Sequence, residues 1–189
     1  GNFTFTPADN VQLQWNTSYT NQWQQNTASG NNAQGISLNT FRRERNYFGS
    51  SAFEDIANVL GFDIQQRIER FTTGGTVTYS PLANLTNRLT IGYDFSQQEN
   101  RNLRPFGFRQ RPKGALLNNT WQKRLLTFDY VSSYIVDVAD ALRTTFSWGG
   151  QAVGDEVRAL EGWGEDYPGA AEPTVSSASL RIAEENRQR

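Results

Sequence analysis

Strict alternation between two kinds of side chain is the feature that most limits how this chain can fold. From Val11 to Trp23 the odd positions are mostly apolar or aromatic, and the even positions carry only Gln, Asn, Ser and Thr. Successive side chains of a β-strand point to opposite faces, whereas a helix repeats about every 3.6 residues. A period of two therefore predicts a long strand with one apolar and one polar face.

The same two-residue period returns along the chain. It covers residues 67–80, 89–96, 121–134 and 142–151, with a short strand at 3–5 and a weaker one at 174–182. Short connections at 7–10, 81–87 and 136–141 alternate with long loops at about 24–66, 99–119 and 154–173. Within the first loop, residues 51–61 have helical spacing, a Ser at the start and a Gly at the end. We therefore expect about six or seven antiparallel strands.

Connections that are short at one end and long at the other are typical of transmembrane β-barrels. The strands also exceed the five or six residues that are usual in soluble sheets. Four aromatic residues lie near predicted strand ends, namely Trp23, Tyr79, Tyr134 and Trp148. At such positions a ring can lie at the membrane interface, in contact with outer-membrane lipid. The sequence thus predicts an all-β fold, an antiparallel transmembrane β-barrel segment with long extracellular loops. Since common barrels begin at about eight strands, residues 1–189 are expected to be one partial barrel domain.

Composition argues against several other functions. The 18 Lys and Arg balance 19 Asp and Glu, so the chain lacks the basic surface that binding to nucleic acid requires. It contains no Cys and no His, which disfavours thiolate metal sites and the commonest general base. Adjacent carboxylates such as Glu165 and Asp166 show no catalytic spacing. We expect no enzyme activity, no catalytic or metal-binding residues and no cofactor.

A soluble sheet is the main alternative, because one apolar face packed on a core gives the same alternation. Such a protein would be a secreted β-sheet module that binds carbohydrate through exposed aromatic side chains. The mean hydropathy of −0.65 does not separate the two, since a barrel wall turns only every second residue toward lipid. A sandwich, however, has turns every 8 to 12 residues or so, and this chain does not.

Several phrases of the sequence resemble mid-barrel strands of SusC/RagA-type TonB-dependent outer-membrane transporters. The strand phrases are Phe3–Pro7, Trp15–Tyr19, Gly74–Pro81 and Asn87–Asp94, and the loop phrases are Arg104–Gly107 and Gly164–Gly169. The resemblance implies a barrel of about 22 strands around a plug, in the outer membrane of a Gram-negative bacterium. It implies coupling to TonB through that plug, which these residues do not include, and a SusD-like surface lipoprotein as partner.

The resemblance further implies import of a bulky nutrient, which is a glycan, a peptide or a chelate. The loop aromatics that are candidates for stacking on such a ligand are Tyr47, Phe48, Trp163 and Tyr167. The same residue types also pack loops against each other, so the structural role stays open for each. A porin-like or structural outer-membrane barrel is the alternative within the membrane class.

Overall fold

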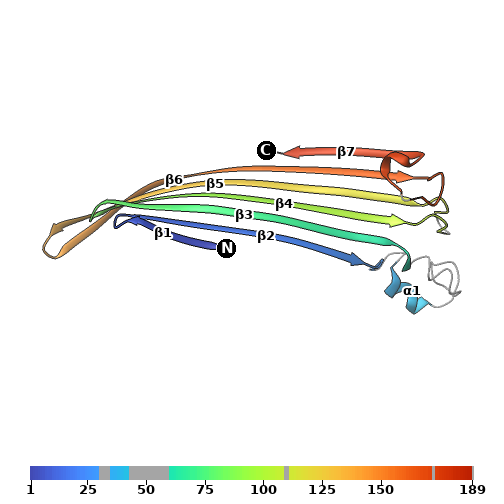
Figure 1. Cartoon of the computed structure of the whole chain (residues 1–189), viewed down its shortest axis with the longest axis horizontal. Coiled ribbons are helices and arrows are strands. Elements are labelled where there is room, and N and C mark those ends of the chain that lie inside the picture. The colour runs from blue at the N-terminus through green and yellow to red at the C-terminus, as the bar shows by residue number, and fades with distance from the viewer. Residues whose placement is uncertain (30–34, 43–59, 109–110, 172, 189) are drawn as a thin grey trace.

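The computed structural model describes residues 1–189 except 30–34, 43–59, 109–110, 172 and 189. The described chain forms one antiparallel sheet of seven strands, ordered in space as in the sequence (Figure 1). The strands are β1 (Asn2–Ala8), β2 (Val11–Asn26), β3 (Asp63–Leu82), β4 (Leu85–Arg104), β5 (Ala115–Ala139), β6 (Leu142–Glu165) and β7 (Leu180–Gln188). The predicted antiparallel all-β architecture is confirmed, and the sheet stays open between β1 and β7.

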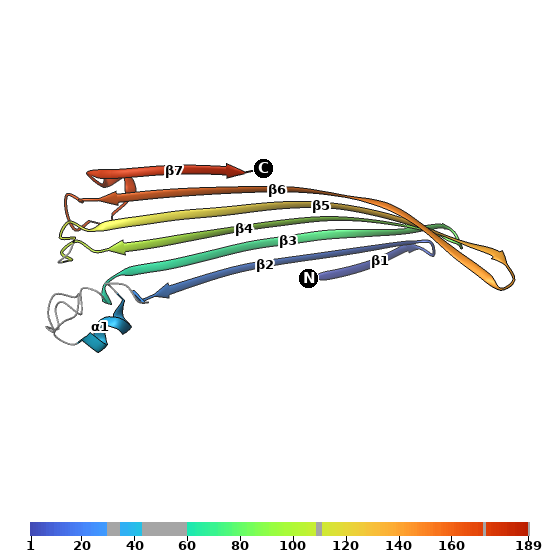
Figure 2. The ribbon, with the colours of Figure 1, turned by 180° about the vertical axis from the view of Figure 1, so that it is seen from behind.

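Short and long connections alternate as predicted. Two residues each join β1 to β2, β3 to β4 and β5 to β6, at Asp9–Asn10, Ala83–Asn84 and Asp140–Ala141. Asn and Asp suit such turns because their short polar side chains bond to the nearby backbone. The longer connections lie together at the opposite end of the sheet, beside helix α1 (Ile36–Arg42) (Figures 1 and 2). We call the two ends the turn end and the loop end.

The predicted boundaries of the three long loops are wrong, because the strands run further than the apolar pattern. β2 continues to Asn26 and β3 begins at Asp63, which shortens the first loop. The second connection is 105–114 instead of 99–119, and β6 continues through more than half of the predicted third loop to Glu165. Backbone hydrogen bonds hold a ladder together whatever the side chains are, so polar residues extend strands without apolar alternation.

The helix predicted at 51–61 lies mostly outside the described residues, and the described helix in this connection is α1. The weak strand predicted at 174–182 is also corrected, since its first half is a 3-10 turn at Val175–Ser177. Thr174 caps this turn, and its Oγ1 accepts a hydrogen bond from the Ser177 backbone N at 3.3 Å. Ser and Thr side chains compete with the ladder in this way, and β7 therefore begins only at Leu180.

The sheet is a single curved layer, and the β5–β6 hairpin extends past its neighbours at the turn end (Figure 2). Buried apolar side chains of the described chain form two small clusters, both at the loop end. One contains Ala28, Phe62 and Phe108, and the other contains Leu116, Tyr167 and Ala178. In the described residues, no helix is long and apolar enough to cross a membrane.

Candidate functional site

The register of the strands assigns each strand residue to one of two faces. Directly paired residues of an antiparallel ladder lie on the same face. Trp15 of β2 pairs with Gly75, which pairs with Ile91 of β4. The row continues to Phe128 of β5 and Ala152 of β6. We call the face that carries this row the apolar face, and the opposite one the polar face.

Apolar side chains form a continuous band across the apolar face, which we call the apolar band. Its residues are Phe3, Phe5, Val11, Leu13, Trp15, Tyr19, Phe71, Val77, Tyr79, Leu89, Ile91, Tyr93, Phe95, Leu126, Phe128, Tyr130, Tyr134, Phe146 and Trp148. Many of these side chains are solvent-exposed, from 38% for Phe71 to 62% for Tyr19. On β3 the band runs from Phe71 to Tyr79, about 26 Å at about 3.3 Å per residue. With a tilt of about 40° this approaches the band of about 25 Å that outer-membrane barrels present to lipid.

Charge replaces apolar side chains abruptly at the loop-end boundary of this band. Two residues beyond Leu126, Arg124 pairs in register with Glu156 of β6. Arg124 Nη1 lies 3.9 Å from Glu156 Oε2, and Arg187 of β7 also binds this carboxylate. Arg158 Nε donates to Glu185 Oε1 at 2.8 Å. The loop-end part of the apolar face is therefore a water-facing surface of ion pairs.

The polar face carries hydrogen-bonding side chains even at the level of the apolar band. Arg70 Nη2 lies 2.5 Å from Asp94 Oδ2, and Thr72 Oγ1 donates to the same oxygen at 3.3 Å. The hydroxyls of Thr76 and Thr90 lie 3.1 Å apart. Such groups need water or each other, so this face suits a hydrated lumen.

All four predicted interface aromatics lie on the apolar face. Tyr79 and Trp148 belong to one row near the turn end, and Tyr134, which pairs with Leu85 and Phe146, lies one row closer to that end. Trp23 lies on the other side of the band, where it pairs with Arg67. Its Nε1 donates to Gln65 Oε1 at 3.4 Å. The structure thus places these rings on the two sides of the band.

Of the four loop aromatics predicted to contact a ligand, the structure describes Trp163 and Tyr167. Tyr47 and Phe48 lie outside the described residues. Trp163 is not a loop residue, because it pairs with Leu117 of β5 and Ile182 of β7. Tyr167 does lie in the β6–β7 connection, but it is only 4% exposed and packs with Leu116 and Ala178. Its ring is not presented to a ligand.

Tyr167 instead helps to fix the loops above β5 and β6. Its backbone N donates to Lys113 O at 3.0 Å, so the 105–114 and 166–179 connections are bonded to each other. A Cβ on Gly164 would lie 2.7 Å from Tyr167 Oη, so the loop fits only because glycine leaves this space. Burial raises the pKa of Tyr167, which lies outside the apolar band.

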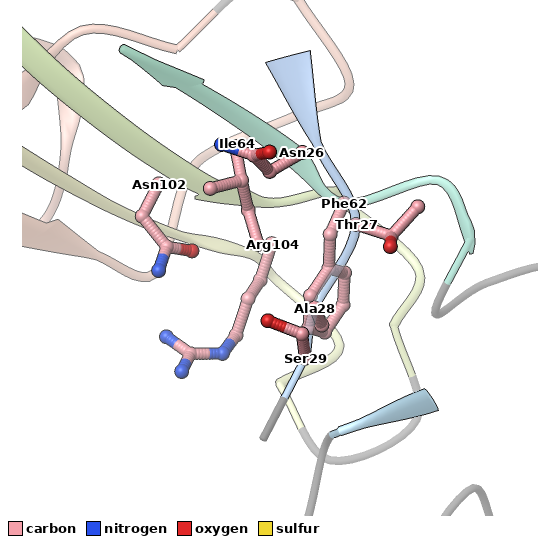
Figure 3. A pocket seen from close by; sticks show the side chains of 8 residues that line it. All are labelled: Asn26, Thr27, Ala28, Ser29, Phe62, Ile64, Asn102 and Arg104. Atoms are coloured by element: carbon pink, nitrogen blue, oxygen red, sulfur yellow. The ribbon is translucent and has the colours of Figure 1, made fainter. Parts of the chain in front are cut away.

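A cavity of about 440 Å³ lies on the polar face at the loop end (Figure 3), and we call it the mouth cavity. The ends of β2 and β4, the start of β3 and the segment after β2 line it, with side chains of Asn26, Thr27, Ala28, Ser29, Phe62, Ile64, Asn102 and Arg104. Phe62 packs edge to face on Phe108 with 4.9 Å between ring centroids, and Arg104 Cζ lies 5.8 Å from the centroid of Phe62. No local sequence pattern predicts this cavity, because its side chains come from chain segments far apart.

Arg104 is the one positively charged side chain among the residues that line the mouth cavity. Burial lowers the pKa of Arg104, and the nearby positive charge of Arg111 lowers it further. Arg104 still keeps its charge at neutral pH, because an arginine guanidinium is not deprotonated in proteins. Among the described residues, no group of three or more Asp and Glu is placed to hold a metal ion.

Comparison with known proteins bears on the fold. No protein-family model and no curated protein sequence matches the chain. A solved structure of the RagAB peptide transporter matches 98% of this chain with a TM-score of 0.76 and 12% sequence identity. This sheet therefore has the fold of a β-barrel segment, as in that structure.

Two further structures of the RagAB peptide importer agree. The "closed-closed" state gives a TM-score of 0.72 at 12% identity, and the "open-open" state gives 0.74 at 13% identity. Each match covers 98% of this chain. The chain spans about a quarter of the matched RagAB chain, 24% in the first structure and 23% in the "open-open" state. The likeness therefore concerns a segment of a barrel.

Proposed function

We propose that this chain is part of the wall of an outer-membrane transporter that imports a bulky nutrient into a Gram-negative bacterium. The observation that carries the proposal is the apolar band, which covers one face of a single-layer sheet and ends in ion pairs such as Arg124–Glu156. In this assignment the apolar band contacts lipid, the polar face lines the lumen and the loop end is extracellular.

Peptide is the cargo that the comparisons favour over a glycan or a chelate, because the similar structures are of a peptide importer. The sequence resemblance to SusC/RagA-type transporters supports two further parts of the proposal. Uptake would be coupled to TonB through a plug outside these residues. A SusD-like surface lipoprotein would bind at the loop end, where the backbone N of Tyr167 donates to Lys113 O and so joins two of the connections.

A soluble carbohydrate-binding module is a weaker explanation of the same sheet. Soluble antiparallel sheets bury their apolar face against a second layer. No such layer covers the apolar band within the described part of the chain, where Leu126, Phe128 and Phe146 are 54%, 44% and 55% exposed. Exposure of this extent fits a face that meets lipid.

Uptake by intact cells tests the proposal and separates it from a porin. A strain that lacks the full-length protein should lose uptake of fluorescently labelled oligopeptides, and the gene should restore it. Collapse of the proton gradient should abolish the restored uptake if the transporter is coupled to TonB. Uptake that continues without the gradient would favour a porin-like barrel, and a protein recovered from the medium would contradict the membrane assignment.

A further inference from the structure

We infer that the apolar face binds the phosphate group of an outer-leaflet lipid just beyond the apolar band, through Arg124, Arg158 and Arg187. We call these three residues the arginine patch. The inference rests on the proposed function, because it needs the apolar band to lie in a membrane. It goes beyond that function by naming a lipid as a bound partner.

The arginine patch begins where a membrane would change from hydrocarbon to headgroups. Arg124 follows Leu126 of the apolar band by two residues, on the same face of β5. This step is about 7 Å along the strand, and less along the membrane normal because barrel strands are tilted. The headgroup layer on each side of a bilayer is about 5–8 Å deep. Arg124 therefore lies at the level of lipid phosphates when the band is in hydrocarbon.

Positive charge exceeds negative charge in the described part of this surface. Arg158 of β6 is the direct cross-strand partner of Arg187 of β7, so two like charges face each other. Glu156 lies one row nearer the turn end, and Glu185 lies one row nearer the loop end. The three guanidiniums of the patch thus share these two carboxylates. Like charges directly opposite each other are destabilising, and a bound anion relieves this repulsion.

Arg124 has hydrogen-bonding capacity left for such an anion. Arg187 Nε donates to Glu156 Oε1 at 2.6 Å, whereas Arg124 Nη1 is 3.9 Å from the other oxygen of this carboxylate. Arg124 donates no hydrogen bond to the described residues, and its side chain is 55% exposed. Its Cζ lies 6.0 Å from the centroid of the Phe95 ring. Contact with a ring limits the conformations of this long side chain, so less entropy is lost when its planar N–H groups bind a phosphate.

The size of the site favours a headgroup over the transported nutrient. Gln122, Glu156 and the arginine patch line a hollow of about 40 Å³. Ligand sites usually measure about 300–1,000 Å³, so this hollow admits only a few atoms. Arg158 and Arg187 are 45% and 47% exposed, so both also reach oxygens at its rim. Arginine binds phosphate through parallel hydrogen bonds, which suits an anion that is held in place by its acyl chains.

Space for those acyl chains lies beside the patch on β6. Between Trp148 and Glu156, the apolar face of β6 carries only Gly150, Ala152 and Gly154. Nothing lies within 4 Å of a Cβ added to Gly150 or Gly154. An acyl chain can therefore lie against the backbone of β6, beside the exposed side chains of Leu126 and Phe128 on β5. One lipid molecule would then contact both the band and the arginine patch.

Native mass spectrometry of the full-length protein in detergent tests the inference. The probes are a phosphorylated glucosamine-disaccharide lipid of the outer leaflet, its dephosphorylated form with the same acyl chains, and inorganic phosphate. Charge-assisted hydrogen bonds predict that the phosphorylated lipid binds about ten- to a hundredfold more tightly than the dephosphorylated one.

Two substitutions should change this preference in opposite directions. R124Q should reduce it about fivefold, because it removes one basic side chain beside an anionic headgroup. E156Q should increase it by about the same factor, because Arg187 then loses the carboxylate that it binds. A gain of binding in E156Q cannot come from a misfolded protein.

R88Q is the matched control, because Arg88 is exposed on the polar face near the turn end, away from the arginine patch. It should leave the preference unchanged. Equal binding of the two lipids, an unchanged preference in R124Q, or weaker binding in E156Q would overturn the inference. Inorganic phosphate that binds as tightly as the lipid would overturn it too, because the acyl chains would then contribute nothing. Equal binding of the two lipids by a protein that still imports peptides would leave the proposed function intact.

Discussion

Phe71 of β3 and Phe95 of β4 are direct cross-strand partners on the apolar face. The next pair on that same face, toward the loop end, is Glu69 with Gln97. Two adjacent strands therefore change from aromatic to polar at the same step. On β5 and β6 the change from apolar to polar side chains occurs one row nearer the turn end. There Leu126 and Gly154 are followed, toward the loop end, by Arg124 and Glu156. A boundary that shifts across the strands is expected where strands are tilted relative to a membrane plane. The register thus gives the apolar band a definite edge.

A charge in the middle of this band should destabilise the protein in a membrane. L89R places a guanidinium on the apolar face, and L125R places the same group on the polar face. Arg at the centre of a lipid-facing surface costs about 2–4 kcal/mol, so L89R should unfold at clearly lower denaturant concentration. Both leucines are partly buried in the sheet, which makes the pair well matched. Unfolding of the full-length protein in lipid vesicles measures the difference, and equal loss in both variants would contradict the assignment of faces.

Gly164 should be needed for the docking of the β6–β7 connection. A Cβ there would lie 2.7 Å from Tyr167 Oη and 2.8 Å from Ala178 Cβ, so G164A must displace the loop. Overpacking of this kind costs about 1–3 kcal/mol. Limited proteolysis should then cut the 166–179 segment faster. G154A is the control, since nothing lies within 4 Å of its added Cβ. If G164A resisted the protease as well as G154A does, the loop would not be packed on Gly164.

Alkaline pH should release the same loop through Tyr167. Burial raises the pKa of Tyr167 above the ordinary 10.0, so the docked loop keeps the phenol neutral after an undocked one has ionised. Docking is therefore unaffected below about pH 10 and weakens as the pH rises beyond it. Tyrosinate absorbance measures the titration, and the difference between wild type and Y167F should show one tyrosine that ionises late.

Y167F should also dock as well as wild type at neutral pH. Tyr167 Oη is buried and makes no hydrogen bond with the described residues, so removal of the hydroxyl breaks no hydrogen bond to them. The variant should resist alkaline release of the loop. A Y167F protein whose loop is cut faster at neutral pH would show that the hydroxyl has a partner that stabilises docking.

The sequence predicted the strands best where one face is apolar. Alternation at Val11–Trp23 and 89–96 identified both the strands and the faces, because the two-residue period follows directly from strand geometry. Alternation did not identify the strand ends beyond the apolar band, because most side chains on both faces are polar there. Trp163 was thus assigned to a loop, since Gly162 and Gly164 resemble turn residues although they leave room for Tyr167 and Val175.

The mouth cavity shows the second limit of the sequence. Asn102 and Arg104 lay inside a predicted loop, and their shared face could not be assigned until β4 was known to continue to Arg104. Phe62 contributes from the position just before β3, about 40 positions earlier in the chain than these residues. No local pattern predicts such a meeting, because it depends on the register between β3 and β4.

A nitroxide scan of β4 and β5 tests the central claim, that the apolar face contacts lipid, most directly. Single cysteines at positions 88–98 and 124–131 can carry the spin label in the full-length protein in lipid vesicles, and residues 1–189 contain no Cys of their own that would also be labelled. Collision with oxygen, which concentrates in lipid, should be high at 89, 91, 93 and 95 and low between them. On β5 the parity should reverse, with high values at 126, 128 and 130, and a water-soluble nickel complex should give the opposite pattern. Water accessibility at 89, 91, 126 and 128 would contradict the account.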